Sequence, residues 1–247
     1  MTALLQAHQL TRRWGGLVAL NAVDIALVRG ELHAVIGTNG AGKSTLINIL
    51  AGEFPPSSGR VALAGKDITG WDQPRRAQAG LGRSYQRNTI FPSFSVFENC
   101  RLAAQSRFQR PWQWWRNAQT CPHSTAIADA VIQRIGLQAM AQRSAGMLSH
   151  GQKRQLEIAM CLATQPQVLL LDEPLAGMGA EETERMLECL HGLKQDHAVL
   201  LVEHDMDAVF RIADRVTVMV NGAVIASGLP NDIRHDPQVR MAYLGEH

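Results

Sequence analysis

The stretch Gly37-Thr38-Asn39-Gly40-Ala41-Gly42-Lys43-Ser44 decides the fold of this chain. It matches G-x-x-x-x-G-K-[ST], the phosphate-binding loop known as Walker A. The apolar run at residues 32–36 predicts a buried strand before the loop, and the pattern of residues 43–50 predicts a helix after it. Strand, loop and helix in this order form the context that the motif requires. The sequence therefore predicts an α/β fold organised around a phosphate site.

The residue types of the loop explain how it would bind a nucleotide. Glycine permits positive φ angles and a close approach of the backbone to a ligand. Successive N–H groups then form an anion nest, and the start of the helix adds partial positive charge. Lys43 brings a full charge to the β- and γ-phosphates, and the Ser44 hydroxyl can bind Mg²⁺. The candidate phosphate-binding residues are Gly37, Thr38, Asn39, Gly40, Ala41, Gly42, Lys43, Ser44 and Thr45.

Composition limits the class of protein. The net charge of +2 is too small to indicate a nucleic-acid partner. No apolar run approaches the roughly 18 residues of a membrane span, and residues 1–10 do not have the pattern of a signal peptide. The four cysteines are far apart, which disfavours a zinc site or a disulfide framework. These features predict a cytoplasmic protein.

A second motif supplies acidic residues. The apolar run 168–171 predicts a buried strand that ends in Asp172 and Glu173. Asp172 can hold Mg²⁺, and Glu173 can orient and deprotonate a water molecule. The alternative is that both acids only cap the end of the strand, and the Walker A motif makes this alternative less favoured.

Four further features have two interpretations each. Trp14 either stacks on a purine ring or covers the end of a strand. Gln86 lies either near Mg²⁺ or simply in solvent. Ser149 caps a helix expected over 154–163, or it forms a second anion site with the glycine two residues on. His204, after the apolar run 198–202, contacts a γ-phosphate or has a structural role.

Other patterns outline the remaining elements. Residues 4–12 and 17–28 alternate in part between apolar and polar residues, which predicts an antiparallel sheet. Residues 95–163 have mostly helical periodicity, and 215–227 predict a hairpin around Asn221-Gly222. Residues 107–116 hold three of the five tryptophans and three arginines. An insertion packed on its own helices is favoured there over a partner-docking, membrane or RNA surface.

Taken together, the motifs resemble the ATP-binding subunit of ABC transporters over nearly the whole chain. Gln86 matches the Q-loop, residues 148–152 match the L-S-G-G-Q signature, and His204 matches the switch histidine. The resemblance implies that ATP and Mg²⁺ are bound. It implies catalytic roles for Glu173 and His204, further nucleotide contacts from Trp14, Gln86, Ser149, Gly151 and Gln152, and metal binding by Ser44, Gln86 and Asp172. Two positions depart from the family pattern: His150 replaces the first signature glycine, and Gly179 stands where many members have the D-loop aspartate.

A narrower resemblance concerns the substrate. Residues 14–20, 172–179, 202–206 and 243–246 are similar to importers of branched-chain amino acids. Importers of urea and of short-chain amides belong to the same subgroup, so these substrates and other amino acids remain alternatives. Two alternatives from other classes are a soluble ABC ATPase acting on the ribosome or DNA, and a cassette that binds ATP without hydrolysing it.

The resemblance also implies an architecture and partners. It implies a single ABC ATPase domain over residues 1–247, with a RecA-like P-loop NTPase core and an antiparallel β-subdomain at about 1–94 and 165–247. An inserted helical subdomain is expected at about 95–164. The expected partners are a second ATPase subunit, head to tail, two transmembrane permease subunits and, indirectly, an extracytoplasmic solute-binding protein. No nucleic-acid partner is expected. The expected location is the cytoplasmic face of the inner membrane, where the chain binds peripherally through the permeases.

Overall fold

The computed structural model describes residues 3–84, 89–108 and 121–244. Gln86, most of the tryptophan-rich segment and residues 245–246 therefore lie outside the described residues. The chain divides into two compact units. The first comprises Met1–Arg83, Gln167–Glu173 and Leu190–His247, and the second comprises Ser84–Pro166 and Pro174–Cys189. The subdomain boundaries expected near residues 94 and 165 stay a prediction.

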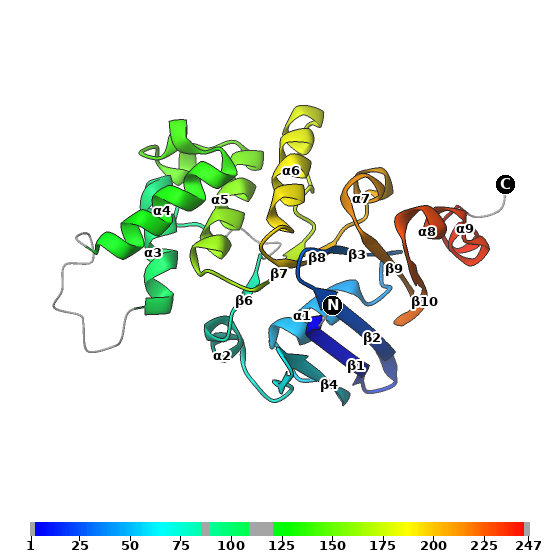
Figure 1. The fold of residues 1–247 in the computed structure, drawn as a ribbon. Coiled ribbons are helices and arrows are strands. Elements are labelled where there is room, and N and C mark those ends of the chain that lie inside the picture. The colour runs from blue at the N-terminus through cyan, green and yellow to red at the C-terminus, as the bar shows by residue number, and fades with distance from the viewer. Residues whose placement is uncertain (1–2, 85–88, 109–120, 245–247) are drawn as a thin grey trace. The chain divides into compact units, whose positions relative to one another are not determined.

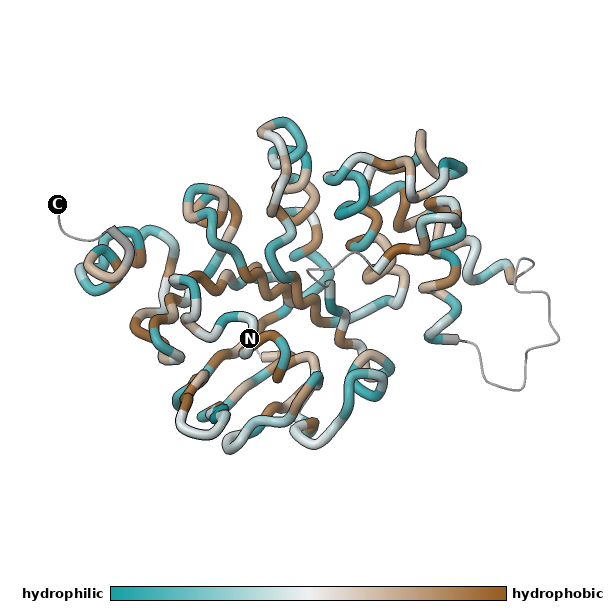
Figure 2. Tube along the Cα trace, turned by 180° about the vertical axis from the view of Figure 1, so that it is seen from behind, coloured by the Kyte–Doolittle hydropathy of each residue, from teal (hydrophilic) through white to brown (hydrophobic). Residues whose placement is uncertain are grey.

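A mainly parallel sheet forms the core of the first unit. In the described part of the chain its order is β10-β9-β3-β8-β7-β6. Its strands are β3 (Leu32–Gly37), β6 (Leu81–Arg83), β7 (Val168–Asp172), β8 (Ala198–Val202), β9 (Arg215–Val220) and β10 (Ala223–Gly228), of which β10 runs antiparallel to β9. Strands β3, β7 and β8 are buried at every position, as expected for parallel strands covered on both faces. Figure 2 shows the hydrophobic residues concentrated along these strands.

The predicted antiparallel sheet is confirmed. Its order is β2-β1-β4-β5, with β1 (Ala3–Trp14), β2 (Leu17–Val28), β4 (Ser58–Leu63) and β5 (Lys66–Asp67). The apolar face of this sheet, both faces of α1 (Lys43–Ala51) and one face of the parallel sheet share one hydrophobic cluster. Helix α1 thus packs between the two sheets (Figure 1), which anchors the helix that follows the phosphate loop.

Shorter helices complete the first unit: α2 (Gln73–Gln78), α7 (Met206–Ile212), α8 (Pro230–His235) and α9 (Pro237–Leu244). Arg76 of α2 is fully buried and donates to the carbonyl oxygens of Ile49 and Leu50 at 2.7 and 2.8 Å. The last carbonyl groups of a helix lack partners within the helix. Arg76 therefore closes the end of α1 and ties α2 to it.

The second unit is helical, as expected. Helices α3 (Val96–Phe108), α4 (Pro122–Ile135) and α5 (His150–Ala163) pack against one another, with the short 3₁₀ helices η3 (Gln138–Met140) and η4 (Ala145–Met147) between α4 and α5. Helix α6 (Ala180–Leu193) begins in this unit. Helix α5 starts four residues earlier than predicted, because Ser149 and Gln152 form a reciprocal capping box.

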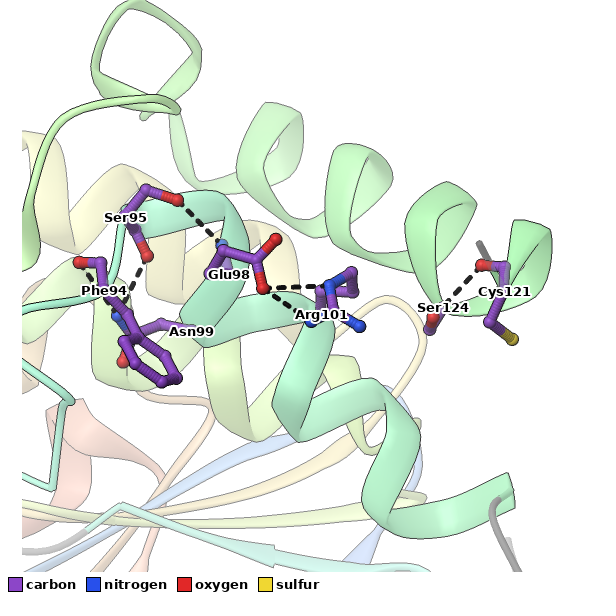
Figure 3. A network of polar contacts seen from close by, with 7 residues as sticks. All are labelled: Phe94, Ser95, Glu98, Asn99, Arg101, Cys121 and Ser124. Atoms are coloured by element: carbon purple, nitrogen blue, oxygen red, sulfur yellow. Dashed lines mark hydrogen bonds and ion pairs between the residues drawn. The ribbon is translucent and has the colours of Figure 1, made fainter. Parts of the chain in front are cut away.

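A polar network fixes the start of α3 (Figure 3). Ser95 Oγ accepts from the Glu98 N–H at 3.1 Å, and the Asn99 amide donates to the carbonyl oxygens of Ser95 and Phe94 at 2.9 and 3.5 Å. The same amide also donates to the Phe91 carbonyl oxygen at 3.1 Å. Arg101 pairs with Glu98 at 2.5 Å. Because Asn99 is fully buried, its amide holds the preceding loop in one conformation.

Among the described residues, no helix has both the length and the apolar character to cross a membrane.

Candidate functional site

The phosphate loop connects β3 to α1, and its glycines have different roles. Gly40 and Gly42 have φ angles of 80° and 97°, which glycine adopts without strain. A Cβ at Gly42 would also lie 2.5 Å from the Ala19 carbonyl oxygen. Gly37 does not need a positive φ, contrary to the sequence expectation. A Cβ there would lie 2.4 Å from the Met219 carbonyl oxygen, so close packing on β9 requires this glycine.

Lys43 is held above this loop. Its side chain is buried, and Nζ donates to the carbonyl oxygens of Gly37 and Thr38 at 2.6 and 3.2 Å. Burial lowers the pKa of the Lys43 ammonium, while the charges of Glu173 and Asp172 oppose that shift. The ammonium is therefore aimed at the loop, where a bound phosphate would compensate its charge.

A cavity of about 460 Å³ lies beside the loop. It is lined by residues 39–45 of the loop and α1, by the turn from Trp14 to Ala19, by Glu173 and by Asn221. Four segments that are far apart in the sequence thus meet at one site. The tertiary structure of the first unit brings together Trp14, the phosphate-binding residues and Glu173.

Trp14 lies at the rim of this cavity, with 43% of its surface exposed. Its ring meets the edge of Phe54 at 5.4 Å, and the Arg12 guanidinium lies 4.8 Å from the ring centre. Both interpretations of Trp14 therefore have a structural basis: the side chain covers the end of β1, and it faces a cavity large enough for a ligand. Stacking on a purine stays a prediction.

The two acids lie at the carboxyl end of β7, as predicted. Asp172 is 3% exposed. Glu173 has a φ of 47° and donates its N–H to the Val202 carbonyl oxygen at 2.8 Å. A positive φ is uncommon outside glycine and is stored strain at many functional sites. Here it ends the strand at the point where Glu173 enters the lining of the cavity.

His204 follows β8 and is exposed, with 60% of its side-chain surface accessible. Its Nδ1 lies 3.6 Å from Oε2 of Glu203, and the same carboxylate oxygen accepts the His204 N–H at 3.2 Å. Glu203 is fully buried. This acid was missed by the motif analysis, although a charged residue directly after a buried apolar strand was the available signal.

The signature-like residues lie in the second unit and are described there by themselves. Ser149 Oγ accepts the Gln152 N–H at 3.2 Å, and Gln152 Oε1 accepts the Ser149 N–H at 3.0 Å. The His150 imidazole turns away from this cap, and its Nε2 lies 3.2 Å from the Ala176 carbonyl oxygen. Gly151 is buried at the first turn of α5.

The oxygen donors near the loop fit Mg²⁺. Magnesium is commonly bound through one or two carboxylates together with substrate phosphates, rather than by a cage of protein ligands. Among the described residues there is no cluster of three or more histidine, cysteine or acidic side chains that could hold a metal. The Ser44 hydroxyl and the Asp172 carboxylate, beside a phosphate loop, match a site in which a carboxylate and substrate phosphates hold Mg²⁺ together.

Comparisons with known proteins agree with this geometry. The family model for the ABC transporter matches residues 20–176, and a model for the branched-chain amino acid ATP-binding cassette transporter matches residues 223–247. The chain is 38% identical to the high-affinity branched-chain amino acid transport ATP-binding protein LivG of Salmonella typhimurium, over 98% of both chains. It is 37% identical to the high-affinity branched-chain amino acid transport ATP-binding protein BraF of Pseudomonas aeruginosa, again over 98% of both chains.

A solved structure resembles the whole chain. A nucleotide-free ATP-binding cassette from an ABC transporter superposes with a TM-score of 0.87 at 28% identity, covering 99% of this chain and all of the other. The fold is that of such a cassette. The chain therefore belongs to the ABC transporter family, as an ATP-binding cassette with ATPase activity.

Proposed function

We propose that this chain is the ATP-hydrolysing subunit of an importer for branched-chain amino acids. The cavity that joins the phosphate loop to Glu173 is the observation that carries the ATPase part of this proposal. The names of LivG and BraF, and the family model at residues 223–247, support the substrate. Importers of urea or short-chain amides and a soluble ATPase acting on ribosomes or DNA are not favoured by these relatives.

In the proposed reaction, the loop amides and Lys43 stabilise negative charge on the transferring phosphoryl group. Ser44, Asp172 and Gln86 would hold Mg²⁺, which would supply positive charge to the phosphate oxygens. Glu173 orients the attacking water and accepts its proton. His204 contacts the γ-phosphate, and Trp14 stacks on the adenine.

The proposed assembly follows from the signature-like segment. Ser149, Gly151 and Gln152 form the start of α5, where a hydroxyl and the positive end of the helix dipole favour an anion. In a head-to-tail dimer this helix start would contact the ATP bound to a second ATPase subunit. Two permease subunits would hold the pair peripherally at the cytoplasmic face of the plasma membrane, and a solute-binding protein would deliver the substrate from outside.

A pull-down from detergent-solubilised native membranes tests this function, with ATPase activity assayed on the eluate. We expect two multi-span proteins, a second cassette, and ATPase activity that rises when the solute-binding protein is added with leucine. The tagged Lys43→Ala variant is the matched control, because it should recover the same partners without the activity. Recovery of ribosomal proteins or DNA without membrane partners would contradict the proposal.

A further inference from the structure

Arg83, the last residue of β6, forms a buried polar cluster beside the nucleotide site. Its side chain is 8% exposed. Nη1 pairs with Glu53 Oε2 at 2.9 Å, and Nη2 donates to Asn48 Oδ1. Nη2 also lies 3.9 Å from Oδ2 of Asp172, whose side chain is 4% exposed. One guanidinium thus contacts three segments of the first unit.

Two of these segments, β7 and α1, carry candidate metal ligands. Asp172 ends β7, which pairs in parallel with β6, so that Arg83 lies beside Leu170 in the sheet. Asn48 lies on α1 one turn after Ser44, and residues four apart share a face of a helix. Arg83 therefore contacts one candidate ligand through its charge and lies on the side of α1 that carries the other. In the sequence, Gln86 follows three residues later.

Arg83 places a positive charge beside the Asp172 carboxylate, and both side chains are buried. Removing one partner of such a pair leaves the other without its compensating charge. The 3.9 Å contact is an ion pair beyond hydrogen-bond distance, so the attraction acts electrostatically. The fork of the guanidinium also allows Asn48 and Glu53 to fix its orientation, which the single ammonium of lysine does not reproduce.

We propose that Arg83 is a positioning residue for the metal–nucleotide complex. Its guanidinium connects the Asp172 end of β7 to Asn48 on α1 and so fixes the position of β7 relative to α1. Asp172 and Ser44 would then be held where both can reach a bound Mg²⁺. This inference rests on the proposed function, because it requires that the chain bind a nucleotide with Mg²⁺. It predicts that loss of Arg83 weakens the contribution of the metal more than the contribution of the phosphate loop.

The test measures ATP affinity by calorimetry, in EDTA and in Mg²⁺, for the wild type and the Arg83→Gln and Arg83→Lys variants. Changes in groups that orient metal ligands typically lower metal affinity 10–100-fold. In EDTA, we expect the ATP affinity of Arg83→Gln to be within about twofold of that of the wild type. The factor by which Mg²⁺ increases the ATP affinity should be about tenfold smaller in this variant than in the wild type. Arg83→Lys should retain part of that gain. Direct Mn²⁺ binding, measured by electron paramagnetic resonance, should follow the same order.

Arg101→Gln is the matched control, because it breaks the ion pair of another buried arginine with Glu98, in the second unit. It should lower the melting temperature and leave the Mg²⁺ effect unchanged. An unchanged Mg²⁺ effect in both Arg83 variants, or an equal loss in EDTA and Mg²⁺, would overturn the inference. A wild-type chain that binds no ATP at all would instead overturn the proposed function. If Arg83→Gln fails to fold, Arg83→Lys and Glu53→Gln, which removes the negative charge of one partner of the guanidinium, take its place: a smaller Mg²⁺ effect in both supports the inference, and an unchanged effect in both overturns it.

Discussion

The Ser149 hydroxyl donates a hydrogen bond of 2.9 Å to Oε1 of Glu182, near the start of α6. The same carboxylate packs against Gly151 so closely that a Cβ at that glycine would lie 2.6 Å from Glu182 Cδ. An anionic group of the chain thus covers the first turn of α5, where the helix dipole favours negative charge. Under the proposed function, this is where the γ-phosphate on the partner subunit would bind, so the Ser149–Glu182 bond must open first.

Glu182→Gln should therefore lower the KM for ATP while leaving kcat little changed. A neutral amide holds Ser149 less firmly than a carboxylate and removes one negative charge from the path of the phosphate. If the free energy of ATP binding becomes more favourable by about 1 kcal/mol, KM decreases roughly fivefold. Steady-state ATPase assays measure it, with Glu181→Gln as the control because that carboxylate is 86% exposed. A KM that is unchanged or higher in Glu182→Gln would show that the bond does not oppose nucleotide binding.

Gly177→Ala should lower stability through the loop that contacts His150. Gly177 has a φ of 74°, and a Cβ there would lie 3.2 Å from His150 Nε2. The backbone strain alone costs on the order of 1–2 kcal/mol, which lowers Tm by about 3–6 °C in a chain of this size. Differential scanning calorimetry measures the change. Adding His150→Gly to Gly177→Ala should restore the part of the Tm decrease that is due to the steric contact with His150.

The control for that prediction is Gly179→Ala. Gly179 has no atom within 4 Å of the position of a Cβ and no positive φ. Its substitution should leave Tm within about 1 °C of the wild type, since surface changes without strain are usually small. Equal destabilisation by both alanines would contradict the role assigned to the His150 contact.

His33 should make stability fall as the pH decreases. Burial lowers the pKa of His33 from 6.5 to about 4, with the Ala26 carbonyl opposing the shift and the charge of Arg215 adding to it. As the pH falls, His33 is protonated near pH 6.5 in the unfolded chain but only near pH 4 in the folded chain. Between these two pH values the unfolded state binds the extra proton, so the free energy of unfolding decreases as the pH falls. Between pH 7 and 5 the loss amounts to about 2 kcal/mol.

Urea denaturation at pH 7 and pH 5 tests this prediction on the wild type and on His33→Gln. The glutamine can still bond to Thr217, whose hydroxyl lies 2.8 Å from His33 Nε2. The free energy of unfolding of the wild type should decrease more than that of the variant, by about 2 kcal/mol. Parallel pH dependence in the two proteins would mean that His33 does not titrate differently on folding.

Glu173→Gln should keep ATP binding and nearly abolish turnover. The amide preserves the shape of the side chain at its strained φ of 47° but cannot accept the proton of the attacking water. Loss of a general base lowers the rate by about 10²–10⁴-fold. Single-turnover hydrolysis and ATP calorimetry together measure the two properties, and a normal hydrolysis rate would refute the assigned base.

Lys43→Ala should lose tight nucleotide binding. The buried ammonium is the full positive charge that the loop contributes, and its removal leaves the phosphates to the backbone amides alone. We expect the Kd for ATP to increase by more than about tenfold, as loss of a charge-assisted contact predicts. The control is Lys66→Ala. Lys66 is on β5, its ammonium lies over the Trp71 ring, and it does not line the cavity beside the phosphate loop. An unaltered affinity in Lys43→Ala would contradict the phosphate-loop assignment.

Local sequence patterns were sufficient for the elements that carry the motifs. Apart from His33 and Asp172, the residues of β3, β7 and β8 are apolar, because parallel strands covered on both faces expose no side to water. The hairpin at Asn221-Gly222 was predicted from its turn residues, since these adopt positive φ with little strain. The order of the motifs then determined the family, which the comparisons confirmed.

Tertiary structure alone decided which residues meet. No periodicity links Trp14 to Glu173, yet packing of β1 and β7 around α1 places both at one cavity. Nothing in the motifs selects Arg83 or Glu182, because the partners of a charged side chain depend on strands and helices brought together from distant parts of the chain. The sequence also indicates the wrong reason for the glycine at position 37, namely a positive φ. The φ of Gly37 is not positive, and the Met219 carbonyl oxygen on the neighbouring strand β9 excludes a side chain there. Local propensity acts within a few residues, whereas burial, charge pairing and close packing act between residues that only the fold brings into contact.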